Sequence, residues 1–228
     1  HMLSTAAFNA LLKTLEEPAP TVILALIASD RRAVPETVAS RCQSIELRPV
    51  PADVITAGLA AHRGTPEDEA TRVARICEGR PGRAIELLDD PAALSRYQQT
   101  VMRVLEASTS TLEGRFRYAR DLSAVYRRDR ESVEAELKIW AGVWRDILLA
   151  SNGLGDQILH EDWRETIDAI AAATANMQIV DALHGLENAA NALARNAVAQ
   201  LALEVMMLDL PSIAPGITVA SSATVAPD

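Results

Sequence analysis

Apolar residues fall into two patterns along this chain, a mixed one in the first fifty residues and a helical one afterwards. Residues 5–15 show helical spacing, with Ser4 as a candidate N-cap. Residues 22–28 form a continuous apolar run, which is typical of a buried parallel strand. Residues 43–48 alternate as a second strand, and residues 35–40 predict a short helix before it. This order indicates the end of a βαβ sheet whose other strands would lie upstream.

Helical periodicity then continues to a proline near the C-terminus. Residues 51–91 predict three short helices, separated by Gly-Pro turns. The segment after them predicts a set of longer helices at residues 93–107, 113–125, 130–151, 160–175, 177–195 and 198–210. Residues 212–228 have low complexity and are expected to be disordered.

Composition favours helices and gives no sign of a membrane protein. Hydrophobic residues make up 49% of the 228 residues and aromatic ones 4%, so the interior is rich in Ala, Leu, Val and Ile. No stretch reaches the roughly 18–20 apolar residues of a membrane span, and no signal peptide is evident. We therefore expect a cytoplasmic protein. Cys42 and Cys77 lie far apart without metal-ligand spacing and are expected to be reduced thiols.

The charge distribution argues against tight DNA binding by this chain alone. The net charge is −9, and residues 92–228 carry 18 acidic and 12 basic side chains. Binding to duplex DNA usually requires several clustered Lys or Arg side chains that displace counterions. None of the predicted segments forms such a basic stripe.

The strongest chemical motif is the triplet Ser40, Arg41 and Cys42 at the end of the predicted short helix. An arginine is always charged, and its planar guanidinium can bridge two phosphate oxygens. At such a position it could stabilise charge that develops on a γ-phosphate held by another subunit. The alternative is that Arg41 pairs with a nearby surface carboxylate, and the triplet alone leaves both possibilities open.

Residues 9–18 read N-A-L-L-K-T-L-E-E-P, and S-R-C follows at Ser40, Arg41 and Cys42. This order and spacing resembles bacterial DNA polymerase III clamp-loader subunits of the AAA+ superfamily. The resemblance implies that Arg41 acts in trans on ATP, with Ser40 and Cys42 as the rest of the motif. The chain contains no G-x-x-x-x-G-K-[ST] loop. The resemblance therefore implies that this fragment binds no cofactor and that neighbouring subunits hold the ATP.

The lid motif favours one type of subunit within that family. Residues 79–84 read G-R-P-G-R-A, and Gly82 stands where the ATPase subunits have a phosphate-sensing arginine. Those subunits also have Thr or Asn after the apolar strand, where this chain has Ala28 and Ser29. The pattern resembles the non-hydrolysing delta-prime type. Two alternatives remain: a gamma/tau-type ATPase whose Walker motifs lie outside this sequence, and a collar-only ring scaffold, which would not need Arg41.

The resemblance implies a mainly α fold. It predicts the truncated C-terminal end of an α/β AAA+ core at residues 1–50, a three-helix lid at 51–91, an all-α helical-bundle collar at 92–211 and a disordered tail at 212–228. The implied partners are the gamma/tau and delta subunits, the sliding clamp and, through the assembled complex, primer–template DNA. The subunit would be no enzyme on its own, but part of a DNA-directed DNA polymerase (nucleotidyltransferase) holoenzyme.

Two apolar sets in the predicted collar have different expected roles. Trp140 and Trp144 lie four residues apart on one helix face and are expected in the core. The final helix carries a stripe that also suggests core packing, and a Met pair that would suit an adaptable contact surface. The stripe consists of Leu201, Val205 and Leu208, and the pair of Met206 and Met207.

Overall fold

The computed structural model describes residues 5–19, 21–28, 31–213 and 217–219. Ser4, the candidate N-cap, and Ser29, which follows the apolar run at residues 22–28, lie outside this part. The described residues are mainly helical, which confirms the predicted fold class. They divide into two compact units, residues 1–49 and 50–228, and each is described by itself.

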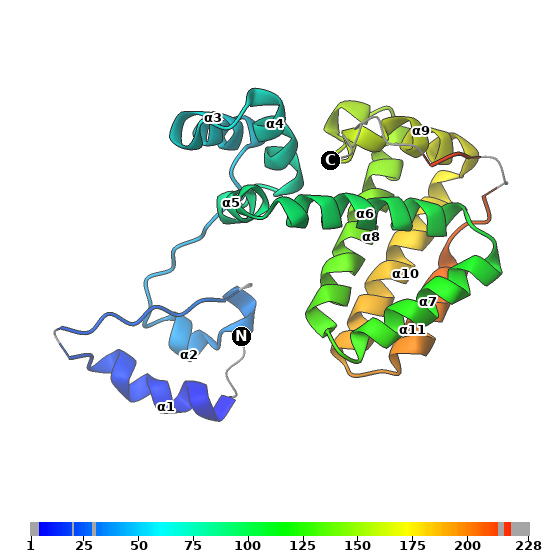
Figure 1. The fold of residues 1–228 in the computed structure, drawn as a ribbon. Helices are drawn as coiled ribbons and strands as arrows, with labels where there is room; N and C mark the ends of the chain where they lie inside the picture. Colours follow the sequence, from blue (N-terminus) through cyan, green and yellow to red (C-terminus); the bar gives the residue numbers. More distant parts are fainter. Residues whose placement is uncertain (1–4, 20, 29–30, 214–216, 220–228) are drawn as a thin grey trace. The chain divides into compact units, whose positions relative to one another are not determined.

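The N-terminal unit is small and has little core. It contains α1 (Thr5–Glu16), the 3₁₀ helix η1 (Arg31–Ala33) and α2 (Glu36–Ala39), with α1 packed against α2 (Figure 1). Among its described residues only Phe8 and Val38 are buried hydrophobic side chains. Two buried anchors contribute little of the apolar area that stabilises a domain.

The two strands predicted in this unit are wrong for the described residues. Segments 22–28 and 43–48 have no assigned regular structure, although the first is a continuous apolar run and the second alternates between polar and apolar residues. Ile23 and Leu47 are 95% and 91% exposed. A strand is stable only when a neighbour satisfies its N–H and C=O groups, and two short strands rarely provide enough pairing by themselves. The apolar pattern therefore identifies segments suited to a sheet, without forming one.

The second unit begins with the three short helices predicted from the Gly-Pro turns. They are α3 (Ala52–Arg63), α4 (Glu67–Ile76) and α5 (Pro81–Asp89). Gly64, at φ 66°, ends α3 in the left-handed conformation that glycine adopts without steric cost. Buried side chains from all three helices form one small core, which includes Ile55, Leu59, Val73, Cys77 and Leu87.

A bundle of longer helices follows. It contains α6 (Pro91–Thr109), α7 (Leu112–Tyr126), α8 (Arg130–Ser151), α9 (Arg164–Ala173), α10 (Asn176–Ala194) and α11 (Ala199–Asp209). α8 packs against α10, and α11 packs against both α10 and α7 (Figure 1). Two 3₁₀ turns, η2 (Gly155–Gln157) and η3 (Glu161–Trp163), connect α8 to α9. The predicted helices thus form close to their predicted bounds, except that α9 begins four residues later than expected.

The bundle core is large and includes the tryptophans. Trp140 and Trp144 are fully buried on α8, which confirms the expectation from their spacing. The indole Nε1 of Trp140 donates a hydrogen bond of 3.0 Å to the hydroxyl oxygen of Tyr118. That hydroxyl donates to the Glu136 carboxylate, and burial, together with this carboxylate, raises the pKa of Tyr118. A buried polar chain of this kind favours one arrangement of the helices.

A buried arginine fastens the end of α11 to α7. The guanidinium of Arg115 donates to the backbone oxygens of Leu210, Pro211 and Ser108, at 2.9, 2.6 and 2.8 Å. Burial lowers the pKa of Arg115. Beyond this clamp, Ile213 is buried in the bundle core. Part of the segment predicted as a disordered tail is described: residues 217–219 include two side chains that pack against that core, Ile217 and Val219.

The two predictions for α11 are reversed by its burial pattern. Met206 and Met207 are fully buried in the bundle, whereas Leu201, Val205 and Leu208 are 61%, 47% and 57% exposed. α11 is apolar on nearly all sides, so spacing alone could not indicate which face meets the core. The structure therefore leaves an apolar stripe on the outer face of this helix. We call these three residues, together with Val198 (70% exposed), the α11 stripe.

Candidate functional site

The Ser40–Arg41–Cys42 triplet lies in the turn that ends α2. α2 begins after Pro35, whose fixed φ suits the start of a helix. The amides of Ser40, Arg41 and Cys42 donate to carbonyls within α2 at 2.9, 3.1 and 3.2 Å. Val38, one turn before the triplet, is fully buried. The turn is therefore fixed by backbone hydrogen bonds and by an apolar anchor, which gives Arg41 a defined starting point.

The guanidinium of Arg41 is held at the surface by two acceptors. Its Nε donates to Glu16 Oε1 at 2.8 Å, and its Nη2 lies 2.6 Å from the same oxygen. Its Nη1 donates to the carbonyl oxygen of Thr37 at 2.8 Å. The Arg41 and Glu16 side chains are 38% and 51% exposed. The surface pairing considered for Arg41 is thus present, and it leaves the side chain accessible to a partner.

Ser40 and Cys42 have different surroundings. The Ser40 hydroxyl donates to the Thr37 carbonyl at 3.3 Å and lies 3.4 Å from Nη1 of Arg41, so it borders the guanidinium. Cys42 is a half-buried free thiol, and Cys77 is a fully buried one whose Sγ donates to the Ala74 carbonyl. Among the described residues, no group of three or more His, Cys, Asp or Glu side chains could hold a metal ion.

Two residues that the sequence did not single out complete this site, Glu16 and Thr37. Glu16 is 25 residues before Arg41, at the last position of α1. Its place in the L-E-E-P string gave no hint of its partner, because the pairing depends on how α1 packs against α2. Thr37 contributes only its carbonyl oxygen, which no side-chain pattern could indicate.

The G-R-P-G-R-A sequence at residues 79–84 has no phosphate-binding side chain at Gly82. Pro81 and Gly82 form the first turn of α5, and Gly82 is exposed. A glycine has no side chain with which to contact a phosphate. Arg80 precedes the helix as its N-cap, and the Arg83 guanidinium lies 6.0 Å from the centre of the Tyr97 ring. Arg80 is thus exposed just before the helix, and Arg83 is half-buried in its first turn.

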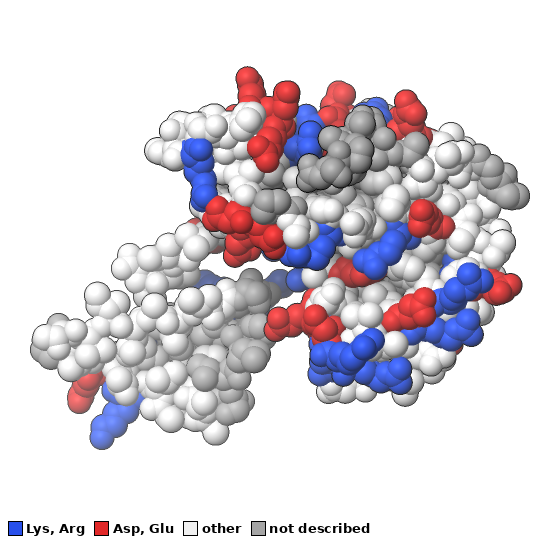
Figure 2. Space-filling view, viewed as in Figure 1, with Lys and Arg blue, Asp and Glu red and all other residues white. Residues whose placement is uncertain are grey.

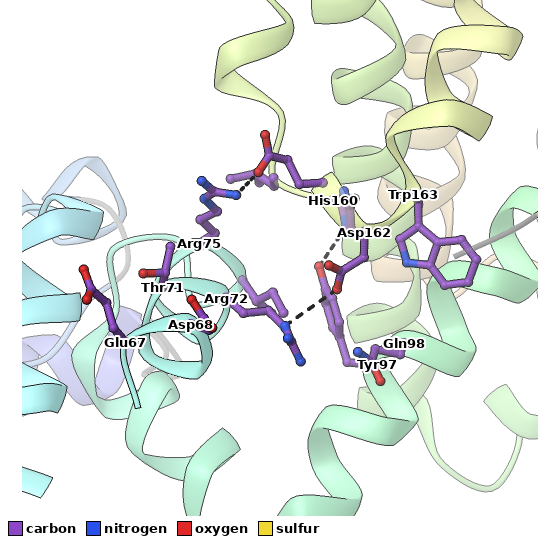
Figure 3. A pocket seen from close by; sticks show the side chains of 13 residues that line it. Glu67, Asp68, Thr71, Arg72, Arg75, Tyr97, Gln98, His160, Asp162 and Trp163 are labelled. Atoms are coloured by element: carbon purple, nitrogen blue, oxygen red, sulfur yellow. Dashed lines mark hydrogen bonds and ion pairs between the residues drawn. The ribbon is translucent and has the colours of Figure 1, made fainter. Parts of the chain in front are cut away.

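A pocket of about 290 Å³ lies between α4 and residues 159–163 (Figure 3). Both arginines that line it pair with carboxylates. Arg72 Nε lies 3.9 Å from Asp162 Oδ2, and Arg75 pairs with Glu161. Glu67 and Asp68 also line the pocket, so it presents mixed charge rather than a site for one class of ion.

A hydrogen-bond chain begins at two residues that line this pocket, Tyr97 and His160, and ends at the fully buried Asp146. The Tyr97 hydroxyl lies 2.7 Å from His160 Nε2, and His160 Nδ1 lies 2.7 Å from Asp146 Oδ2. The same carboxylate oxygen accepts from the amides of Leu159 and His160, both at 2.9 Å. Burial raises the pKa of Tyr97, so its hydroxyl stays protonated at neutral pH. The chain fixes the loop before η3 and explains His160 as a structural residue.

On the visible face of residues 50–228, acidic and basic side chains are interspersed (Figure 2). In the part of the chain that the structure describes, no helix is both long and apolar enough to cross a membrane.

Residues 1–51, which include α1, α2 and the triplet, match the family described as "DNA polymerase III, delta subunit". This chain is similar to subunits of DNA polymerase III. It is 34% identical to subunit tau of Bacillus subtilis (strain 168) over 100 residues, which are 42% of this chain and 18% of tau. It is 23% identical to subunit delta' of the same strain over 212 residues, 91% of this chain and 62% of that subunit.

Subunit tau of Escherichia coli (strain K12) is 34% identical over 118 residues, 50% of this chain and 18% of tau. The chain therefore spans less than two thirds of each of these relatives. The matches confirm the resemblance to DNA polymerase III subunits that the N-A-L-L-K-T-L-E-E-P and S-R-C motifs indicated. Similarity to delta' extends over most of this chain, whereas the matches to tau are more identical but shorter.

Proposed function

We propose that this chain is part of a non-hydrolysing, delta-prime-like subunit of a DNA polymerase III clamp loader. Its Arg41 would act in trans on ATP bound by a neighbouring gamma/tau subunit. The observation that carries this proposal is the Arg41 guanidinium, which is held at an accessible surface by a fixed turn. A second, supporting observation is that the family match to residues 1–51 includes this turn.

The chemistry of the site suits such a role. Hydrolysis of ATP develops negative charge on the γ-phosphate oxygens, and an arginine supplied by a neighbour stabilises that charge. The Arg41 and Glu16 side chains are 38% and 51% exposed, so the phosphate oxygens of a partner could reach the guanidinium. ATP itself would be held by the neighbouring subunit, and this chain would contribute no catalytic activity on its own.

The α11 stripe supports assembly through the helical bundle. An apolar helix that exposes one face to water commonly covers that face with a partner. The proposed partners are the gamma/tau and delta subunits, with the sliding clamp and primer–template DNA engaged by the complete complex. The complex would work in the cytoplasm, as part of a DNA polymerase holoenzyme.

A gamma/tau-type ATPase is the second candidate, because the matches to tau are 34% identical, against 23% for delta'. The two candidates differ at the lid, where Gly82 cannot supply a phosphate-sensing side chain. They also predict different ATPase activities. The full-length gene product of a gamma/tau-type subunit would hydrolyse ATP when purified alone, and that of a delta-prime-type subunit would not.

The test uses the full-length gene product, mixed with its cognate gamma/tau and delta subunits, the clamp and primed DNA. Arg41→Ala should leave assembly intact by size exclusion, and should lower DNA-stimulated ATP hydrolysis and clamp loading by about 10-fold or more. Arg48→Ala, at another exposed arginine of the same unit, is the matched control. Unchanged hydrolysis in a well-assembled Arg41→Ala complex would refute the role in trans.

A further inference from the structure

The contact between Glu16 and Arg41 joins two parts of the N-terminal unit that are distant in sequence. Glu16 is the last residue of α1, and Arg41 follows α2. Both Nε and Nη2 of the guanidinium meet the single oxygen Oε1 of Glu16, at 2.8 and 2.6 Å. Two donors on one carboxylate oxygen fix the plane of the guanidinium as well as its position.

A third contact fixes the remaining edge of the group. Nη1 donates to the Thr37 carbonyl at 2.8 Å, so all three nitrogens of Arg41 have an acceptor. A guanidinium carries five N–H donors, and Nη2 has two of them. One hydrogen on Nη2 therefore remains for a further acceptor while Glu16 holds the other. The side chain can meet a phosphate oxygen without first leaving its present orientation.

The exposure of this ion pair indicates that its main effect is not to stabilise the fold. The two side chains are 38% and 51% exposed, and pairs of this kind contribute little to folding. Their effect on Arg41 itself is larger, because an unrestrained arginine samples many rotamers that must be given up when it binds. An arginine that is already oriented loses less of this freedom on reaching the transition state.

From this geometry we propose that Glu16 is a positioning residue, which orients Arg41 for the γ-phosphate of a neighbouring subunit. The proposal rests on the proposed function, since it assigns no role to Glu16 unless Arg41 acts in trans. Glu16 itself touches neither nucleotide nor reacting atoms. It acts through the Arg41 guanidinium, together with the Thr37 carbonyl.

Glu16→Ala in the full-length gene product tests this role, in the reconstituted complex with gamma/tau, delta, clamp and primed DNA. We expect kcat for DNA-stimulated ATP hydrolysis to fall about 3- to 10-fold, because the freed side chain must be ordered in the transition state. The KM for ATP should change less than about 2-fold, because the nucleotide is bound elsewhere. Glu17→Ala, at the adjacent exposed carboxylate, is the matched control and should match wild type.

Two further variants separate positioning from a purely structural role. Glu16→Gln keeps an oxygen acceptor without the charge, so its kcat should lie between those of Glu16→Ala and wild type. In an Arg41→Ala background, Glu16→Ala should cause no further loss, because Glu16 acts only through Arg41. A further loss in that background would assign Glu16 to the fold and overturn the proposal.

The outcomes also distinguish this proposal from the proposed function. If Arg41→Ala lowers hydrolysis while Glu16→Ala equals or exceeds wild type, Arg41 acts in trans and Glu16 does not position it. If Arg41→Ala has no effect, the role of Arg41 itself is wrong. Reduced hydrolysis by Glu16→Ala, with intermediate activity for Glu16→Gln, supports both the role of Arg41 in trans and its positioning by Glu16.

Discussion

The N-terminal unit and the helical bundle differ in how far their apolar side chains are buried. In the bundle, tryptophan, isoleucine and leucine side chains from every helix are removed from water, including Trp140 and Trp144. In the N-terminal unit, Phe8 and Val38 are the buried hydrophobic side chains among the described residues, while Ile23 and Leu47 are almost fully exposed. The buried side chains of the bundle can account for its stability, whereas those of the N-terminal unit are too few to do so.

The match to a known family lies in the unit that has the smaller core. The family match covers residues 1–51, the part with the least core, and does not extend into the bundle. Residues that pack a core can exchange for others of similar size, so packing places weak demands on identity. The N-A-L-L-K-T-L-E-E-P and S-R-C strings are not explained by packing in this unit. Both strings lie within the residues that match the family, and the candidate site pairs Arg41 from one string with Glu16 from the other.

The largest expected effect lies in the bundle core. Trp144→Ala should destabilise the protein by about 3–5 kcal/mol, because Trp144 is fully buried and its removal leaves a cavity. Urea unfolding followed by circular dichroism measures this change. Met177→Ala, at a side chain 71% exposed on α10, should stay within about 0.5 kcal/mol. Equal effects for the two variants would mean that the bundle is not the main source of stability.

A smaller effect is expected where the bundle holds its last helix. Arg115→Leu should cost about 2–3 kcal/mol, because three backbone carbonyls lose their donor in a buried place. Arg120→Leu, at an exposed position on the same helix, is the control. A melting temperature that is the same for both variants would show that the clamp on Leu210 and Pro211 contributes nothing.

The α11 stripe should matter for assembly and little for folding. Leu201→Glu should weaken association with the other subunits by about 10-fold or more, because it places a charge in an apolar contact. The melting temperature should hardly change, because Leu201 is 61% exposed. Met177→Glu serves as the exposed control on α10. Normal association of Leu201→Glu would show that the stripe is not part of the interface.

The smallest expected effect lies in the N-terminal unit. Ile23→Ser should change the free energy of unfolding by no more than about 0.5 kcal/mol, because Ile23 is 95% exposed. Val38→Ser, at a fully buried side chain of the same unit, should be clearly more destabilising. Hydrogen exchange of residues 1–49 can follow both. A large loss for Ile23→Ser would mean that another segment covers this side chain.

The bundle could be predicted from the sequence because its helices depend on local periodicity. The exception, the start of α9, follows from η3, a 3₁₀ turn that does not keep the helical spacing. The strands at 22–28 and 43–48 failed because strand formation requires a partner, which local pattern cannot supply. The buried face of α11 could not be chosen, because eight of its eleven positions are apolar.

The site was predictable only in part. The motif indicated Arg41 and its surface position, and the structure places both Ser40 and Arg41 around the Thr37 carbonyl. Glu16 could not be found in this way, since its contact with Arg41 spans 25 residues and depends on the packing of α1 against α2. The Tyr97–His160–Asp146 chain was missed for the same reason.

The most direct measurement is a structure of the assembled complex with a non-hydrolysable ATP analogue and primed DNA. The role in trans predicts that a guanidinium nitrogen of Arg41 lies within about 3.2 Å of a γ-phosphate oxygen on the neighbouring subunit. It also predicts that Glu16 still contacts the other edge of that guanidinium. An Arg41 that faces solvent, or a different arginine at the γ-phosphate, would contradict it.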